Sequence, residues 1–390
     1  MPSAPTTSIE LSSADVVADP YPHFARERAR HEVARHEPSG TWLTFSHAAA
    51  GAVLRNRRLG RIWRDREPAA YLEPFNLLHR NQMMENEPPE HTRLRRAVAG
   101  AFNRGHVERL RPRVQSLASS LLDEVDPAGF DVIGEYAEPL PVLVIAELIG
   151  LSGADVPALR AWSQAIVRMY EPAPSQDVVD AAVEAATDFA DLVREHLDRR
   201  RSRPGEDLTT DLLAAGLSDD ELVAAVVLLL NAGHEASVNV FGNGLVALLS
   251  HGQRPGADPA LTVEEMLRFD SALQLFERTA TETVEVAGVR IEEGERIAAL
   301  LGAANRDPAV FADADSFDPA RDPNPHLAFG AGVHFCLGAP LARMELVESL
   351  GTLFTRFPRL DLVGEPESRG TFVLRGFRRV VVGTHPSRRS

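Results

Sequence analysis

The chain has 390 residues, 44% of them hydrophobic, and a formal net charge of −15. This length and composition allow one large domain with a sizeable core, and the acidic balance disfavours non-specific binding to nucleic acid. The single cysteine excludes an internal disulfide and a zinc site built from several cysteines, which suits a cytoplasmic protein. We find no internal repeat, no signal-peptide pattern and no apolar run long enough to cross a bilayer, so no membrane association is expected.

The first part of the chain predicts short elements. Residues 19–22 form a turn that leads into a helix ending near residue 30, and residues 41–45 alternate weakly as a strand does. Ser46 then caps a helix that ends near residue 55. Residues 57–78 show no clear period, and an exposed irregular loop is one interpretation of this stretch.

A helix that begins at Pro88 and Pro89 carries the next notable pattern, EHTRLRR. His91 and Arg95 are four residues apart, so they share one helical face. Donors paired in this way can hold a carboxylate, although a solvated basic helix shows the same pattern.

Helical periodicity continues over residues 107–125, 142–149, 156–170 and 178–200. Ser218 and Glu221 form a capping box at the start of a helix that extends to residue 249. This helix is apolar on most sides and is therefore expected to be buried. Polar residues 231–237, NAGHEAS, lie deep within it and require a partner or a function.

Two shorter patterns follow in the C-terminal half. Glu265 and Arg268 share a helical face, which by itself indicates no more than a surface ion pair. Residues 284–291 alternate around Ala287 and Gly288, as expected for a β-hairpin.

The only cysteine, Cys336, lies between glycines in the stretch HLAFGAGVHFCLGAPLARME, residues 326–345. The glycines predict a tight loop, and the spacing of Leu341, Met344 and Val347 predicts a helix after it. A helix N-terminus favours an anionic sulfur through its free N–H groups and its dipole. Such a cysteine is an inert thiol, a nucleophile or a metal ligand.

The pattern F-G-x-G-x-H-x-C-x-G around this cysteine resembles the heme-binding loop of cytochrome P-450 enzymes. The resemblance covers residues 20–382 and implies one mainly α-helical domain with a small β-rich region, of the soluble actinobacterial type. It implies that Cys336 is the thiolate ligand of heme b. The motif positions are Phe329, Gly330, Gly332, His334, Cys336 and Gly338.

Three further groups of residues acquire roles from the same resemblance. His91, Arg95 and Arg278 match the basic positions that contact the heme propionates. Glu265, Arg268 and Arg321 match a buried structural network. The resemblance also implies that residues 57–78 form a variable loop and a short helix over the substrate. The candidate substrate pocket comprises Trp63, Phe75, Met169, Ala232, Leu275, Phe372 and Val373.

The central helix departs from the family pattern A/G-G-x-E/D-T. Glu235 supplies the acid, but Ala236 stands where the family has a threonine that helps to deliver protons. Ser237 follows, about 100° further round the helix. We expect a substrate group, or a water that it holds, to complete the proton path. Loss of catalysis and chemistry that depends less on oxygen insertion are the alternatives.

The implied reaction is the oxidation of a small organic molecule by O2, by hydroxylation or epoxidation, in the tailoring of a secondary metabolite. Oxidative C–C or C–N coupling or cyclisation is the alternative reaction. A peroxygenase and a non-catalytic heme-binding protein are the other classes. Electrons are expected from a ferredoxin and its reductase, which would dock on a basic stretch by charge complementarity. That stretch contains Arg93, Arg96, Arg104, Arg109, Arg111 and Arg113.

Overall fold

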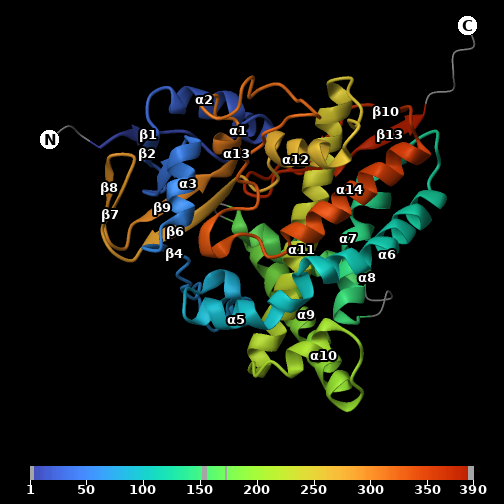
Figure 1. Ribbon diagram of the computed structural model, residues 1–390. Coiled ribbons are helices and arrows are strands. Elements are labelled where there is room, and N and C mark those ends of the chain that lie inside the picture. The colour runs from blue at the N-terminus through green and yellow to red at the C-terminus, as the bar shows by residue number, and fades with distance from the viewer. Residues whose placement is uncertain (1–3, 152–155, 172–173, 385–390) are drawn as a thin grey trace, which may run out of the picture.

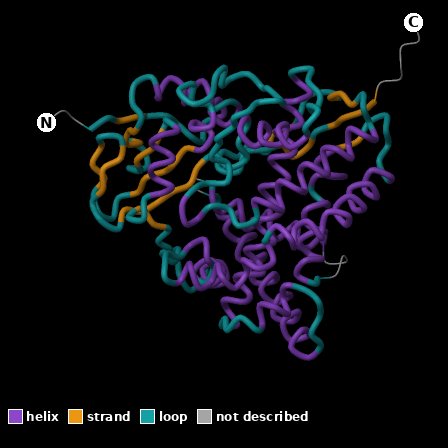
Figure 2. The backbone as a smooth tube through the Cα atoms, in the orientation of Figure 1, coloured by secondary structure: helices purple, strands orange, loops and turns teal. Residues whose placement is uncertain are grey.

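The computed structural model describes residues 4–151, 156–171 and 174–384. A β-rich side and a larger helical side make up this part of the chain, and the long helix α11 (Asp219–Ser250) runs through the middle of the molecule (Figure 1). Figure 2 shows the strands gathered mainly on one side, with most helices on the other. The mainly α-helical architecture expected from the sequence is confirmed.

The β-rich side is built on a six-stranded sheet of order β1-β2-β3-β9-β6-β4. Its central strands β3 and β9 are parallel, with Trp42 opposite Ile297, and the apolar side chains of α3 contribute to the same core cluster. Ser46 caps α3 by accepting the N–H of Ala49. The elements are β1 (Thr6–Thr7), α1 (Ala14–Ala18), α2 (Tyr21–Arg28), β2 (Val33–His36), β3 (Trp42–Thr44), α3 (His47–Arg55), β4 (Leu59–Gly60), β6 (Leu275–Ala280) and β9 (Arg296–Leu300).

Smaller sheets flank this core. The hairpin predicted around Ala287 and Gly288 is confirmed, and both residues have positive φ angles, of 49° and 74°. A three-stranded sheet has the order β10-β13-β5, and a second hairpin pairs β11 with β12. The strands are β5 (Phe130–Asp131), β7 (Val284–Val286), β8 (Val289–Ile291), β10 (Leu360–Leu362), β11 (Glu367–Ser368), β12 (Phe377–Arg379) and β13 (Val381–Thr384).

The helical side contains most of the predicted helices close to their expected positions. The helix expected to reach residue 170 ends as an α-helix at Val167 and continues as a 3-10 turn, Arg168–Tyr170. The helices are α4 (Glu73–Arg80), α5 (Glu90–Ala99), α6 (Arg104–Asp123), α7 (Pro139–Ile149), α8 (Val156–Val167), α9 (Gln176–Ser202), α10 (Leu208–Leu213), α12 (Pro259–Phe269), α13 (Leu301–Asn305) and α14 (Ala339–Arg356).

Residues 57–78 are not an irregular loop throughout, because this stretch contains β4 and most of α4, the short helix that the family resemblance implies. The helix has only eight residues, so its periodicity is too brief to stand out, and a helix of this length depends on tertiary packing. Phe75 and Leu78 are buried on its inner face.

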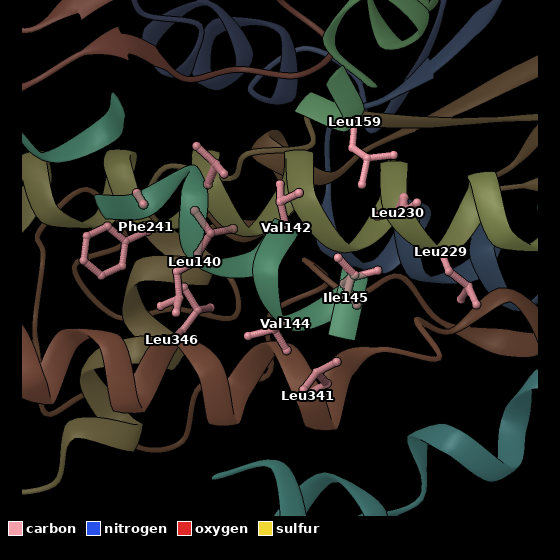
Figure 3. Close-up of a cluster of buried hydrophobic side chains, with 14 of the residues drawn as sticks. Leu140, Val142, Val144, Ile145, Leu159, Leu229, Leu230, Phe241, Leu341 and Leu346 are labelled. Atoms are coloured by element: carbon pink, nitrogen blue, oxygen red, sulfur yellow. The ribbon is translucent and has the colours of Figure 1, made fainter. Parts of the chain in front are cut away.

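Helix α11 is the core of the fold. Its N-terminal capping box is present as predicted. Among the described helices, it alone is long and apolar enough to cross a membrane, but 72% of its apolar window is buried within the protein, as in a core helix. Val142 and Ile145 of α7 lie beside it, and Val144 points toward Leu341 of α14 (Figure 3). A Cβ at Gly233 would lie 3.0 Å from Cγ1 of Ile145, so this glycine allows α7 to approach closely.

Candidate active site

The loop around Cys336 needs its glycines for steric reasons. Gly330 and Gly332 have φ angles of +69° and +72°, and a Cβ at Gly332 would lie 2.4 Å from the carbonyl oxygen of Leu54 in α3. The loop therefore packs directly against helix backbone, which only glycine permits at this position. The N–H of Cys336 donates to the carbonyl oxygen of Phe329 at 2.9 Å, which closes the loop.

Cys336 is partly exposed and lies three residues before the start of α14, as predicted from the sequence. Burial of the sulfur raises the pKa of the Cys336 thiol. The N–H groups of Gly338 and Ala339 and the charges of Arg95 and Arg343 act in the opposite direction. The loop and the helix start thus supply the donors that an anionic sulfur ligand requires.

The basic residues expected near the heme propionates lie beside this loop. Arg95 donates through Nη2 to the carbonyl oxygen of Phe335 at 2.8 Å. The His91 ring is buried against the ring of His334, with centroids 4.5 Å apart, and burial lowers the pKa of His91 to about 4. His91 is therefore neutral at pH 7.

Arg278 is a buried cation whose charge is not matched by an ion pair within the described residues. It is 3% exposed, and its Nη1 donates to the carbonyl oxygen of Glu277 at 2.9 Å. Burial, followed by repulsion from Arg61, lowers the pKa of Arg278 to about 10. A buried guanidinium of this kind is suited to receive an external carboxylate.

Glu87 is a member of this cluster that the sequence reasoning missed. Its Oε1 lies 2.8 Å from Nε2 of His334, and the same atom accepts the N–H of Arg61 at 2.7 Å. Burial alone would raise the pKa of Glu87, but these hydrogen bonds prevail and lower it. An acid three residues before the start of a basic helix was the available signal in the sequence.

One face of α11 is open within an otherwise buried helix. Ala232 is exposed, and Ala236 one turn later is partly exposed, whereas Glu235 and Ser237 are buried. Residues four apart share a helical face, so the two alanines form a small, methyl-lined surface. Such a surface leaves room for a flat, bulky group to approach the helix.

The acid of the central motif points into a charged network. Arg369 donates to Oε2 of Glu235 at 2.8 Å and to Glu138, the residue that precedes α7, at 3.2 Å. Burial raises the pKa of Glu235, and Arg369 opposes that shift. Glu138 also accepts from Arg160 and Gln164 of α8. No local pattern around Arg369 marked it as the partner of Glu235, which lies 134 residues earlier.

Ser237 lies on a different face of α11 from Ala236. It lines a cavity of about 10 Å³, together with Tyr136 and Glu345. A cavity of this size holds about one water molecule. Burial raises the pKa of Glu345 to about 8, so its carboxyl group is mostly protonated at neutral pH.

The predicted pocket residues do not all lie at one surface. Trp63 stacks on His79 with ring centroids 4.9 Å apart, and fully buried Phe75 also stacks on His79, at 3.9 Å. Met169 is also buried in the main core. Only Ala232 is fully exposed among the seven; Leu275 is half-buried.

The prediction that the Phe372 side chain faces the pocket requires correction. Its ring is 2% exposed and meets the ring of Phe24 edge-on, with centroids 6.3 Å apart. It belongs to an N-terminal core cluster that also includes Val373, with Leu275 packed against it. The physical reason is that the turn carrying Phe372 buries its ring between α2 and the sheet.

The third predicted group comes together as a buried ion cluster. Arg268 donates to both carboxylate oxygens of Glu265 at 2.7 Å, and Nε of Arg321 lies 3.1 Å from Oε2 of the same residue. Glu265 and Arg268 are both fully buried.

These residues fit a heme. The Cys336 sulfur, with N–H donors nearby, would ligate the heme iron. Arg278, which forms no ion pair with the described residues, would receive the propionates together with Arg95 and His91. The described residues contain no group of three or more His, Cys, Asp or Glu side chains that could hold a metal ion. The fold and the site together define a heme-thiolate oxidoreductase.

Comparisons with known proteins identify the family. The family model "Cytochrome P450" matches residues 260–373. The chain is 38% identical to cytochrome P450 monooxygenase PikC of Streptomyces venezuelae, covering 93% of this chain and 90% of PikC. It is 37% identical to the 6-deoxyerythronolide B hydroxylase of Saccharopolyspora erythraea, covering 95% and 97%. The chain therefore belongs to the cytochrome P450 family.

A solved structure agrees with this assignment. P450BioI, in complex with an acyl carrier protein ligated to hexadec-9Z-enoic acid, superimposes with a TM-score of 0.89 at 30% identity, covering 95% of this chain and all of that one. The protein is a cytochrome P450 monooxygenase of the soluble bacterial kind, and its cofactor is heme b.

Glu345→Gln should change how stability depends on pH. The native protein keeps a proton on Glu345 up to about pH 8, whereas the unfolded chain releases it near the ordinary value of 4.5. This residue therefore makes the free energy of unfolding fall as pH rises between those values, and the glutamine variant lacks that contribution.

We expect the variant to gain stability relative to wild type as pH rises from about 5 to about 8, measured by urea unfolding of the holoprotein. The exposed turn variant Glu293→Gln is the control. A constant difference between wild type and Glu345→Gln across this range would contradict the assignment.

Proposed function

We propose that the protein oxidises a small organic molecule with O2 as a tailoring step in secondary metabolism, by hydroxylation or epoxidation. The cysteine loop is the observation that supports this proposal, because it offers a single sulfur ligand beside the cations Arg95 and Arg343. The names of the relatives support the substrate class: one is a hydroxylase of 6-deoxyerythronolide B. Cytoplasmic location and the absence of membrane association remain predictions.

In this proposal Cys336 would ligate the heme iron, and His91, Arg95 and Arg278 would hold the propionates. Phe329, Gly330, His334 and Gly338 shape the loop. When bound, the heme supplies the activation of dioxygen. The chain supplies the rest: it orients the cofactor, gives the substrate an apolar surface at Ala232 and Ala236, and controls where protons enter.

Proton delivery is proposed to depend on the substrate. Ala236 has no hydroxyl group, and Ser237 lies on the face of α11 that meets Glu345. Glu235 is engaged by Arg369. A hydroxyl group of the substrate, or a water held by it, is therefore the group best placed to give a proton near Ala236.

Oxidative coupling or cyclisation of a natural-product scaffold is the second candidate. Ala236 favours it too, because coupling of substrate radicals requires no oxygen insertion. The products separate the two reactions: hydroxylation and epoxidation add one oxygen atom, whereas coupling removes two hydrogens and adds none.

Electrons are proposed to come from a ferredoxin and its reductase, which bacterial P450s use in general. The docking surface is narrower than the basic stretch predicted. Arg93 pairs with Glu90, Arg111 with Glu108, and Arg113 with Glu147. Arg96, Arg104 and Arg109 are exposed and form no ion pair with the described residues, so they are the cations left for an acidic partner.

Cys336→Ala tests the cofactor assignment. Wild type reduced under carbon monoxide should show the red-shifted Soret band of thiolate ligation, and the variant should lose it because no sulfur remains. Heme content and circular dichroism control for folding. A wild-type band typical of a neutral ligand would overturn the proposal.

Ala236→Thr tests substrate-assisted proton delivery. If the substrate supplies the hydroxyl group, adding a threonine should leave unchanged or lower the amount of product formed per NADPH consumed, because the new side chain competes for the same space. Ala232→Thr controls for lost space one turn away. The probe is a macrolactone whose binding shifts the Soret band. A marked rise in coupling for Ala236→Thr alone would contradict the proposal.

Charge reversal tests the docking surface. Arg96→Glu with Arg104→Glu should raise the KM for ferredoxin about tenfold at low salt, with less effect at high salt. Arg113→Glu, whose wild-type residue is already paired with Glu147, should have a smaller effect. Equal changes in the KM for ferredoxin in the two variants would contradict the assignment of the docking surface to Arg96 and Arg104.

A further inference from the structure

The guanidinium of Arg343 lies over the ring of Phe329, with Cζ 4.5 Å from the ring centroid. Phe329 opens the cysteine loop, and its carbonyl oxygen accepts the N–H of Cys336 at 2.9 Å. Arg343 belongs to α14, the helix that follows the loop. A side chain of α14, Arg343, thus packs on Phe329, the residue whose carbonyl oxygen closes the loop around the cysteine.

Glu264 of α12 fixes the plane of this guanidinium. Nε and Nη2 of Arg343 donate to its two carboxylate oxygens at 2.6 and 2.9 Å. Burial alone would raise the pKa of Glu264, but the hydrogen bonds from Arg343 and His326 prevail and lower it to about 2. The carboxylate is therefore charged at any pH at which the enzyme operates, and the pair persists. A two-point pair of this type orients a planar cation, which a lysine cannot reproduce.

His326 brings the start of the loop to the same carboxylate. Its Nδ1 accepts the N–H of Ala328 at 3.2 Å, so the proton of the neutral ring is on Nε2, which donates to Glu264 at 2.9 Å. The His326 side chain is 2% exposed. Glu264 thus joins α12, the beginning of the loop and α14.

We propose that Arg343 is a positioning residue for the heme-thiolate bond: its guanidinium, oriented by Glu264, holds Phe329 in place and sets a fixed positive charge near the Cys336 sulfur. This inference rests on the heme-thiolate assignment. It makes two separable claims. The first claim is that the Arg343 guanidinium, stacked on Phe329, keeps the loop closed. The second claim is that the positive charge of Arg343 would favour the reduced state of a heme bound at Cys336.

The test uses three holoprotein variants. Arg343→Gln removes both the planar guanidinium and its charge. Arg343→Lys keeps the charge but loses the planar group that donates two hydrogen bonds to Glu264. Arg356→Gln is the matched control, because Arg356 lies at the other end of α14 in an exposed pair with Asp123. Heme content per chain and circular dichroism are recorded for each variant.

Two properties are measured: the midpoint reduction potential, and the rate at which the ferrous carbon monoxide complex loses its red-shifted band on mild warming. Arg343→Gln should lose the band about fivefold faster, the effect of one lost cation–π contact of ordinary strength, and should have a more negative potential. Arg343→Lys should lose the band as fast but keep a potential close to that of wild type. Arg356→Gln should change neither.

The proposal fails if Arg343→Gln matches wild type in both measurements. It also fails if Arg343→Gln, Arg343→Lys and Arg356→Gln lose the band equally fast with unchanged potentials, since that indicates a general loss of stability. If Arg343→Gln binds no heme, the lifetimes of the band in Arg343→Lys and Arg356→Gln are compared instead. The claim about the loop then fails if the two lifetimes are equal. A wild-type protein without the red-shifted band would instead overturn the heme-thiolate assignment itself.

Discussion

A buried ion cluster at Glu265 holds the heme side of the molecule together. Its carboxylate accepts hydrogen bonds from Arg268, Arg321 and Asn324, and from the backbone N–H of Asp318. This ties α12 to the segment that leads into the cysteine loop. Removing one partner from such a cluster costs about 3–5 kcal/mol, because a charge is left buried and unpaired. The neighbouring residue Glu264 extends from the same helix to the loop itself.

Different faces of helix α11 carry side chains with different chemical roles. One face carries the small side chains Ala232 and Ala236, a second directs Glu235 toward Arg369, and a third places Ser237 in the cavity with Glu345. A step of one residue turns the side chain by about 100°. A hydroxyl group displaced by one position is therefore presented to different neighbours, and Ser237 faces the cavity with Glu345.

Charge is distributed unevenly around the site. In a chain of net charge −15, Arg95 and Arg343 contact the cysteine loop, and Arg278 lies near Glu87, the partner of His334 in the loop. Two of these are engaged by backbone carbonyls, and Arg343 by a carboxylate. Arg95 and Arg278, which donate only to carbonyl oxygens, keep their full charge for an anionic ligand group. Arg343, which is paired with a carboxylate, instead positions the loop and contributes to the electric field at the sulfur.

Local rules were enough for part of this protein. The cysteine loop, the capping box of α11 and the Glu265 motif are read within a few residues, because glycine geometry and helical spacing act at short range. The family resemblance extended these motifs to a fold and a cofactor. Only the tertiary structure paired Arg369 with Glu235, added Glu87 to the basic cluster, formed α4 and turned Phe372 into the core. Each of these depends on packing between segments distant in sequence, on which local spacing has no bearing.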